Sequence, residues 1–227
     1  MLVVFDVDGT LIDGEEYDWK SFNDAFTEVT GRSFSIEFWK SLDEVTASAI
    51  VRQGLSDLPE NEQEELELKV RDRCLENLRD ERERNPNAFG STRETRQLLE
   101  NLQLHESIDL AIATGDWLET IRFKLKAADI SLESFVHATS SDHPVRSNII
   151  QLAAERSRRD LQDTIYVGDG VWDIRACRIL GIPFIGTGQR IEALREAGAQ
   201  WILEELETEA LMEVIERMAK AGIIENR

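Results

Sequence analysis

The segment FDVDGTL, residues Phe5 to Leu11, contains two aspartates where an apolar run gives way to a turn. Residues 2–5 are all apolar, which is typical of a buried strand in a parallel sheet. Gly9 permits a sharp turn because it has no Cβ atom. Ligands of open α/β sheets bind beyond the carboxyl ends of the strands, so we expect Asp6 and Asp8 to face one pocket. An isolated Asp-Gly pair would indicate only a turn, and the motifs downstream are what favour a site.

A second acidic motif, VGDGVWD, follows the apolar run at residues 164–167 and contains Asp169 and Asp173. Taken singly, Asp169 reads as a helix N-cap and Asp173 as a favourable charge in a first helical turn. Mg²⁺ prefers oxygen ligands and binds one or two carboxylates together with phosphate and water. Asp6, Asp169 and the backbone carbonyl of Asp8 can supply such a set. The two motifs together therefore predict a magnesium site that offsets the repulsion between an anionic nucleophile and a phosphate.

A third motif, DLAIATGD, lies between the first two and ends a further apolar run with Thr114 and Gly115. A hydroxyl and free backbone N–H groups at a junction of strand and helix form an anion-binding corner. A single Thr-Gly pair is more often a turn than a phosphate site. Its position between two acidic strand ends favours phosphate binding here.

The three motifs, DxDGT, a strand-terminal Thr and GDxxxD, resemble in this order the haloacid dehalogenase superfamily of phosphohydrolases. The resemblance extends over residues 1–185 and is greatest to the branch of phosphoglycolate phosphatase and β-phosphoglucomutase. It implies a central first strand and a helical cap inserted after that strand. It also implies a role for each matching residue: Asp6 as nucleophile, Asp8 as general acid and base, Thr114 and Gly115 as phosphate binders, Asp169 as a magnesium ligand, and Asp173 as a direct or supporting ligand.

One element departs from the family pattern. Members carry a lysine, often before a proline, between the second and the last motif, and here the region reads SSDHPVRSNIIQ with His143 before Pro144. We expect Arg146 to replace that lysine, because a guanidinium stays charged and binds phosphate through two hydrogen bonds. His143 is the weaker alternative, since a neutral imidazole offers less to a dianion. Loss of catalysis is the expected result if neither side chain reaches the phosphate.

The order of apolar runs and helical periods predicts the fold class, an α/β protein with a Rossmann-like, doubly wound parallel sheet. The predicted domains are a catalytic core at residues 1–13 and 88–227 and a helical cap at residues 14–87. Strands are expected at residues 2–5, 110–113, 135–137, 164–167, 183–185 and, at one edge, 200–203. Core helices are expected at residues 117–128, 147–156 and 207–221 and from about residue 171.

In the cap, the predicted helices cover residues 16–30, 35–40, 42–53 and 60–84, and Asn85, Pro86 and Asn87 end the last. The cap face that closes over the pocket selects the substrate in capped relatives. We therefore regard Lys20, Thr46 and Arg52 as candidate substrate contacts, although ordinary packing or exposure explains each equally well.

Composition limits the partners. The 227-residue chain is 41% hydrophobic, enough for one α/β core and a smaller cap, and its net charge is −19. Nucleic-acid binding needs clustered Lys and Arg, so a small phosphorylated metabolite is the expected partner. No apolar run reaches membrane-spanning length, and the first strand leaves no room for a signal peptide. Two distant cysteines fit a reduced compartment, and we expect a cytoplasmic monomer or homodimer.

The sequence thus predicts a Mg²⁺-dependent phosphatase that works through a phosphorylated Asp6. A phosphomutase with the same core and a binding protein that has lost turnover are the alternatives. A signalling receiver domain is a further alternative, but it has about half this length and needs a lysine after its fifth strand, and none follows Ile185 here.

Overall fold

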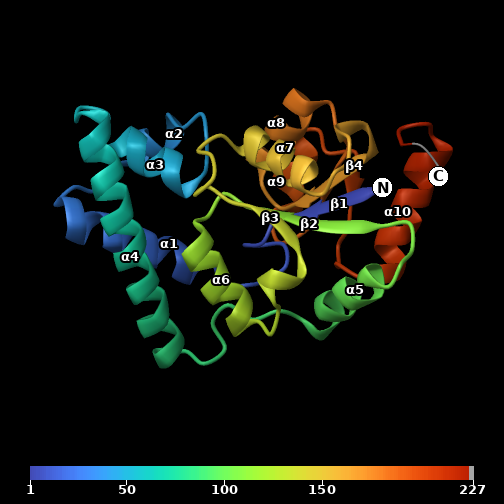
Figure 1. The fold of residues 1–227 in the computed structure, drawn as a ribbon, viewed down its shortest axis with the longest axis horizontal. Coiled ribbons are helices and arrows are strands. Elements are labelled where there is room, and N and C mark those ends of the chain that lie inside the picture. Colours follow the sequence, from blue (N-terminus) through green and yellow to red (C-terminus); the bar gives the residue numbers. More distant parts are fainter. Residues whose placement is uncertain (225–227) are drawn as a thin grey trace.

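Six parallel strands form one sheet in the computed structural model, which describes residues 1–224 (Figure 1). The strand order is β3-β2-β1-β4-β5-β6, so the first strand is central and pairs with β2 on one side and β4 on the other. The strands are β1 (Leu2–Phe5), β2 (Asp109–Ala113), β3 (Val136–Ala138), β4 (Thr164–Gly168), β5 (Phe184–Gly186) and β6 (Trp201–Ile202). The predicted parallel α/β class is confirmed, and each strand lies within two residues of its predicted place.

Helices cover both faces of the sheet. On one face, alternate strand residues such as Leu2 and Val4 pack against α7, α8 and α9, and on the other Val3 and Phe5 pack against α5, α6 and α10. Side chains of successive strand residues point to opposite faces, so an all-apolar strand such as β1 suits only a sheet covered on both sides. The core helices are α5 (Arg93–Gln103), α6 (Leu118–Ala127), α7 (Arg146–Arg156), α8 (Val171–Leu180), α9 (Ile191–Glu196) and α10 (Thr208–Lys220).

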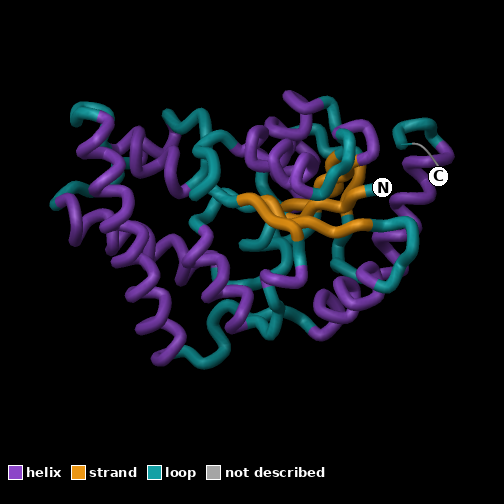
Figure 2. The backbone as a smooth tube through the Cα atoms, viewed as in Figure 1, coloured by secondary structure: helices purple, strands orange, loops and turns teal. Residues whose placement is uncertain are grey.

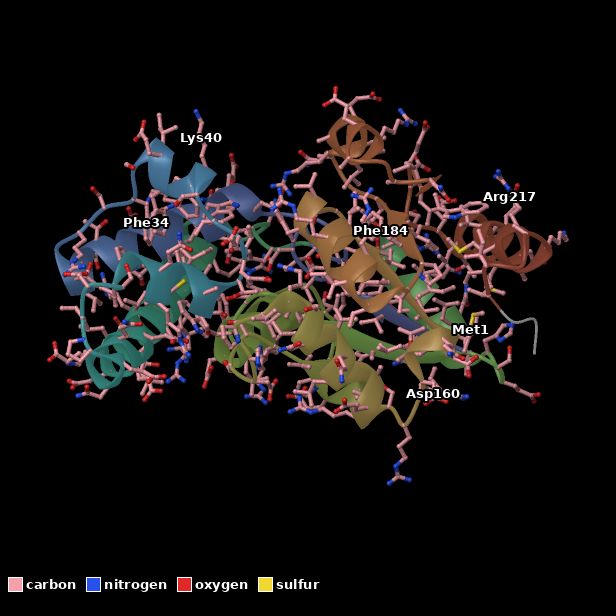
Figure 3. All side chains as sticks on the ribbon, turned by 90° about the horizontal axis from the view of Figure 1, so that it is seen from above. Met1, Phe34, Lys40, Asp160, Phe184 and Arg217 are labelled. Atoms are coloured by element: carbon pink, nitrogen blue, oxygen red, sulfur yellow. The ribbon has the colours of Figure 1, made fainter. Side chains whose placement is uncertain are left out.

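The segment between β1 and α5 is helical and lies beside the sheet, with no strand among its helices (Figure 2). It contains α1 (Glu15–Thr30), α2 (Ile36–Lys40), α3 (Ala47–Gly54) and α4 (Glu60–Arg84), and α1 packs along α4. Phe34 and Lys40 of this segment lie far from Met1 and Arg217 of the core (Figure 3). We call residues 14–87 the cap, following the predicted limits.

The two connections between cap and core run side by side. The backbone N–H of Asp13 donates to the carbonyl of Gly90 at 2.8 Å. Gly14 has φ +112° and Phe89 has φ +56°, so the chain turns through left-handed conformations at both crossings. This paired crossing fits a cap that begins near residue 14 and ends near residue 88.

The helix predicted at residues 42–53 is wrong in its first part, because α3 begins only at Ala47. Thr46 is extended, and its hydroxyl accepts a hydrogen bond from the N–H of Ala49. These are the features of an N-cap residue, so the helix begins directly after Thr46. The non-helical segment before it contacts the core, and the Val45 carbonyl accepts a hydrogen bond from Arg146 at 2.9 Å. A helix through Val45 would have used that carbonyl internally.

Cys74 and Cys177 are both buried and unpaired. Among residues 1–224, none of the helices combines the length and the apolar composition that crossing a membrane requires.

Candidate active site

The loop after β1 presents Asp6 and Asp8 at the carboxyl end of the central strand. The N–H of Asp6 donates to the Val167 carbonyl at 2.9 Å, so β4 fixes the position of Asp6. Gly9 has φ +75°, and a Cβ atom there would collide with the Asp169 carboxylate. Glycine is therefore required at this turn both for its backbone conformation and for the close approach of Asp169.

Arg146 is buried beside Asp6 at the first position of α7. Its Nη1 lies 3.3 Å from Asp6 Oδ2 and 2.8 Å from Asp173 Oδ1. His143 instead accepts a hydrogen bond from the Val145 N–H at 3.0 Å and contacts Asn148. Of the two residues considered for the missing lysine, the structure places Arg146 next to the predicted nucleophile.

Three carboxylates, two directly after strands and one in the first turn of α8, gather into a group that suits a divalent cation. Asp6, Asp169 and Asp173 each offer an oxygen within 4.8 Å of the others. Asp169 is almost fully buried, and its Oδ1 has no hydrogen-bond partner while its Oδ2 accepts from Arg190. A buried carboxylate oxygen without a partner is costly unless a ligand binds it. Three hard oxygen donors fit Mg²⁺, and these residues would hold it.

The side chain of Asp8, the fourth residue of the predicted metal site, does not join this group. Both its oxygens accept from the Lys124 ammonium at 2.7 Å. The ligand expected from Asp8 was its backbone carbonyl, and that expectation stays a prediction.

Burial dominates the charge state of these carboxyls. Burial and the neighbouring Asp173 raise the pKa of Asp6 to about 6, against the lowering effect of Arg146. Burial also raises the pKa of Asp8 to about 6, against Lys124. For Asp169, burial and the charge of Asp6 raise the pKa to about 9. A divalent cation bound by Asp6 and Asp169 would lower the pKa values of these two residues, because it favours the ionised carboxylates.

Thr114 and Gly115 lie at the end of β2, where the sequence predicts phosphate contacts. The buried Thr114 hydroxyl hydrogen-bonds to Asp6 and lowers its pKa. A Cβ atom on Gly115 would collide with the Arg146 guanidinium and would lie 2.9 Å from the Val45 carbonyl oxygen. Gly115 thus allows Arg146 and the cap to approach the end of β2.

The cap closes one side of a cavity of about 80 Å³ over these residues. By volume such a cavity holds a few water molecules or a small anion. Thr46, a candidate substrate contact, lines the cavity, and its hydroxyl donates to the Pro144 carbonyl at 2.6 Å. The N–H of Ala47 donates to the Gly115 carbonyl at 2.7 Å. The start of α3 therefore contacts the two loops that hold the predicted phosphate binders.

Lys20 and Arg52, the other predicted cap contacts, do not line this cavity. Lys20 is exposed and pairs with Asp24 one helical turn away at 2.6 Å. Arg52 binds Glu67 of α4 at 2.8 Å. Both side chains pair with carboxylates of the cap, and their role as substrate contacts stays a prediction.

Lys124 is one of two residues near the site that the sequence interpretation missed. It is fully buried in α6 and binds Asp8, Asp18 of the cap and Asp116 at 2.6–2.7 Å. Burial by itself would lower the pKa of Lys124, but the three carboxylates together raise it well above its ordinary value. A signal was available: Lys124 shares the apolar stripe of its helix with Ile121 and Leu125, where a solvated lysine does not belong.

Arg190 is the second missed residue. Its Nη2 lies 2.8 Å from Glu15 of the cap, and its guanidinium packs over the Trp172 ring at 5.3 Å. It lies 21 positions beyond Asp169, outside every motif of the sequence, and only the fold brings it to the group of Asp6, Asp169 and Asp173.

The geometry and the fold identify the class of protein. The family model of the haloacid dehalogenase-like hydrolases matches residues 3–187, and the chain belongs to this family. None of the curated proteins matches the chain.

Several solved structures share the fold. A hydrolase from Pseudomonas syringae is 18% identical, with a TM-score of 0.72 over 95% of this chain and 98% of that one. β-Phosphoglucomutase from Clostridium difficile is 17% identical, with a TM-score of 0.73 over 98% of both chains. CbbY from Rhodobacter sphaeroides, solved with phosphate, is 18% identical, with a TM-score of 0.69 over 90% of this chain and 93% of that one. At such identities the likeness shows the fold alone.

Proposed function

We propose that the protein is a Mg²⁺-dependent phosphatase that hydrolyses a small phosphomonoester through a phosphorylated Asp6. The observation that carries the proposal is the contact of buried Arg146 with Asp6, next to Thr114 and to the unpartnered oxygen of Asp169. A nucleophile, a cation for the phosphoryl oxygens and a metal-binding group thus meet at one point. The phosphate bound to CbbY and the phosphomutase among the structural neighbours support phosphoryl chemistry on this fold.

In the first step, an oxygen of Asp6 attacks the phosphorus and the bond to the alcohol oxygen breaks. Arg146, the Thr114 hydroxyl and the backbone at Gly115 hold the phosphoryl oxygens, and Asp8 gives its proton to the departing alkoxide. A Mg²⁺ ion at Asp6, Asp169 and Asp173 would neutralise negative charge on the phosphoryl group.

In the second step, water attacks the phosphorus of phosphorylated Asp6. Asp8, now ionised, takes a proton from that water, and inorganic phosphate leaves with Asp6 regenerated. Asp8 must carry a proton for the first step, and its raised pKa of about 6 favours that state at mildly acidic pH.

A phosphomutase is the less favoured alternative. It must bind a second phosphate, and among the described residues that line the cavity Arg146 is the one cation beside six carboxylates. Lys20 and Arg52 are paired elsewhere in the cap. A small metabolite substrate, a cytoplasmic location and a monomeric or homodimeric state belong to the same proposal.

The test is phosphate release from 4-nitrophenyl phosphate with and without Mg²⁺, for the native protein and for Asp6→Asn. We expect turnover that requires Mg²⁺ and that Asp6→Asn abolishes. Asp13→Asn is the matched control, because Asp13 follows the same motif but is exposed, and it should keep native turnover. No release by the native protein would refute the proposal, and release only after addition of a sugar bisphosphate would favour the mutase.

A further inference from the structure

Lys124 connects the predicted general acid to the cap. Its ammonium has no exposure to solvent and lies 2.7 Å from both oxygens of Asp8. Asp116, after β2, lies 2.7 Å away, and Asp18, in the first cap helix, lies 2.6 Å away. One side chain of α6 thus joins two strand-end loops of the core to α1 of the cap.

The ammonium contacts all three carboxylates. It donates hydrogen bonds to both oxygens of Asp8 and to Asp18, and it forms an ion pair with Asp116 at 2.7 Å. Asp8, Asp18 and Asp116 also line the cavity of the candidate active site. Both oxygens of the Asp8 carboxyl are therefore held by the buried ammonium of α6, while Asp8 still lines the cavity.

Stability does not explain this arrangement. Replacement of a buried ion pair by apolar side chains of similar volume is often neutral or stabilising. The neighbours of Lys124 on the buried side of α6 include Ile121 and Leu125, so an apolar residue would suit the helix. The cluster instead surrounds the one carboxyl whose direction matters for proton transfer to a leaving group.

Resting on the proposed function, we infer that Lys124 is a positioning residue, which fixes the Asp8 carboxyl for proton transfer and ties its position to the cap through Asp18. Asp18 is the one member of the cluster that belongs to the cap. A movement of α1 away from α6 removes Asp18 from Lys124 and leaves the ammonium shared between Asp8 and Asp116. The placement of Asp8 then depends on whether the cap is closed.

Leaving groups provide the test, because an alkoxide needs a proton on departure and 4-nitrophenolate does not. The measurement is kcat/KM for 4-nitrophenyl phosphate and for a simple alkyl phosphate, since kcat/KM covers the steps up to departure of the leaving group. The variants are Lys124→Met and Asp18→Asn. Each value is taken at the maximum of that variant's pH profile, which separates a change of Asp8 position from a change of its ionisation.

Matched controls lie on the same helices. Lys126→Met changes an exposed lysine of α6, and Asp24→Asn changes a half-buried aspartate of α1 that pairs with Lys20. Both are expected to keep native values with both esters. Thermal unfolding of every variant checks that the fold is retained, and Asp18→Asn keeps the test valid if Lys124→Met does not fold.

General acid catalysis contributes about 10²–10⁴-fold, so we expect Lys124→Met to lower kcat/KM for the alkyl ester about 10²-fold more than for the aryl ester. Asp18→Asn should also lower kcat/KM more for the alkyl ester than for the aryl ester, but by a smaller factor. If kcat/KM falls equally for both esters in folded variants, the positioning role is overturned. The proposed function still stands in that case, provided that the native protein hydrolyses the aryl ester. Absence of native activity with either ester would overturn the function itself, and the inference with it.

Discussion

Replacement of Arg146 by methionine is expected to destabilise the protein strongly, in a manner that depends on pH. The substitution leaves Asp6 and Asp173 buried without their shared cation. Removal of one partner of a buried ion pair costs about 3–5 kcal/mol. For a chain of this size each kcal/mol lowers the melting temperature by roughly 2–4 °C, which gives a decrease of roughly 6–20 °C.

The sign of the pH dependence follows from the pKa of Asp6, which burial raises to about 6 even with Arg146 present. Without the guanidinium the folded-state pKa values of Asp6 and Asp173 rise further above those of the unfolded chain. The folded variant then binds more protons than the unfolded one, so its stability falls as pH rises. The loss relative to native protein should be larger at pH 8 than at pH 5.

The assay is urea unfolding at pH 5 and pH 8 with a chelator present, so that no cation replaces the guanidinium. Arg156→Met is the matched control: Arg156 ends the same helix, pairs with Asp142 and is 40% exposed. An exposed pair contributes about 0–1 kcal/mol. The reasoning fails if Arg146→Met costs no more than Arg156→Met, or if its cost grows as pH falls.

Three further outcomes are expected. Mg²⁺ at about a hundredfold its dissociation constant should raise the free energy of unfolding by about 2.7 kcal/mol, measured by urea titration, and Asp169→Asn should remove most of that increment. Gly115→Ala should lower phosphatase turnover by about 10²-fold, because its Cβ displaces Arg146 and loss of one stabilising contact to the transition state costs on that order. Gly90→Ala is the control and should keep native turnover, because the atom nearest to its Cβ lies at 3.4 Å. A phosphate ester of an uncharged alkyl alcohol should have a higher kcat/KM than phosphoglycolate, which carries an additional carboxylate, because carboxylates predominate around the cavity. Added salt should reduce this difference, and equal kcat/KM values at low salt would contradict the expectation.

Much of the fold was predictable because it follows from local patterns. The apolar runs at residues 2–5, 110–113 and 164–167 are short, and each is followed by a motif that ends a strand. Both the presence and the position of these strands could therefore be predicted. The central place of β1 came from the family resemblance, and the sheet order confirms it. The start of α3 was missed because residues 42–46 have helical composition, whereas contacts of Val45 and Thr46 with the distant core keep these residues out of the helix.

The site was predictable where a motif marks it and not elsewhere. Asp6, Thr114 and Asp169 each end a strand, so the rule that parallel strands end at one edge brought them together. Lys124 and Arg190 reach the same place from α6 and from the loop before α9, and their partners are 116 and 21 positions away. No local spacing encodes such pairs, although a lysine within an apolar stripe was a visible anomaly.

The central position of β1 has a consequence for synthesis of the chain. Its four residues are fully apolar and pair on both sides with strands that follow much later, at Asp109–Ala113 and Thr164–Gly168. At about 5–20 residues per second the ribosome needs roughly 5–20 s to add the about 100 residues between β1 and β2. During that interval the cap helices are synthesised and α1 can pack along α4, while β1 has no neighbouring strand with which to pair. The cap helices can therefore pack before β1, the strand that precedes the predicted nucleophile, gains either of its neighbouring strands.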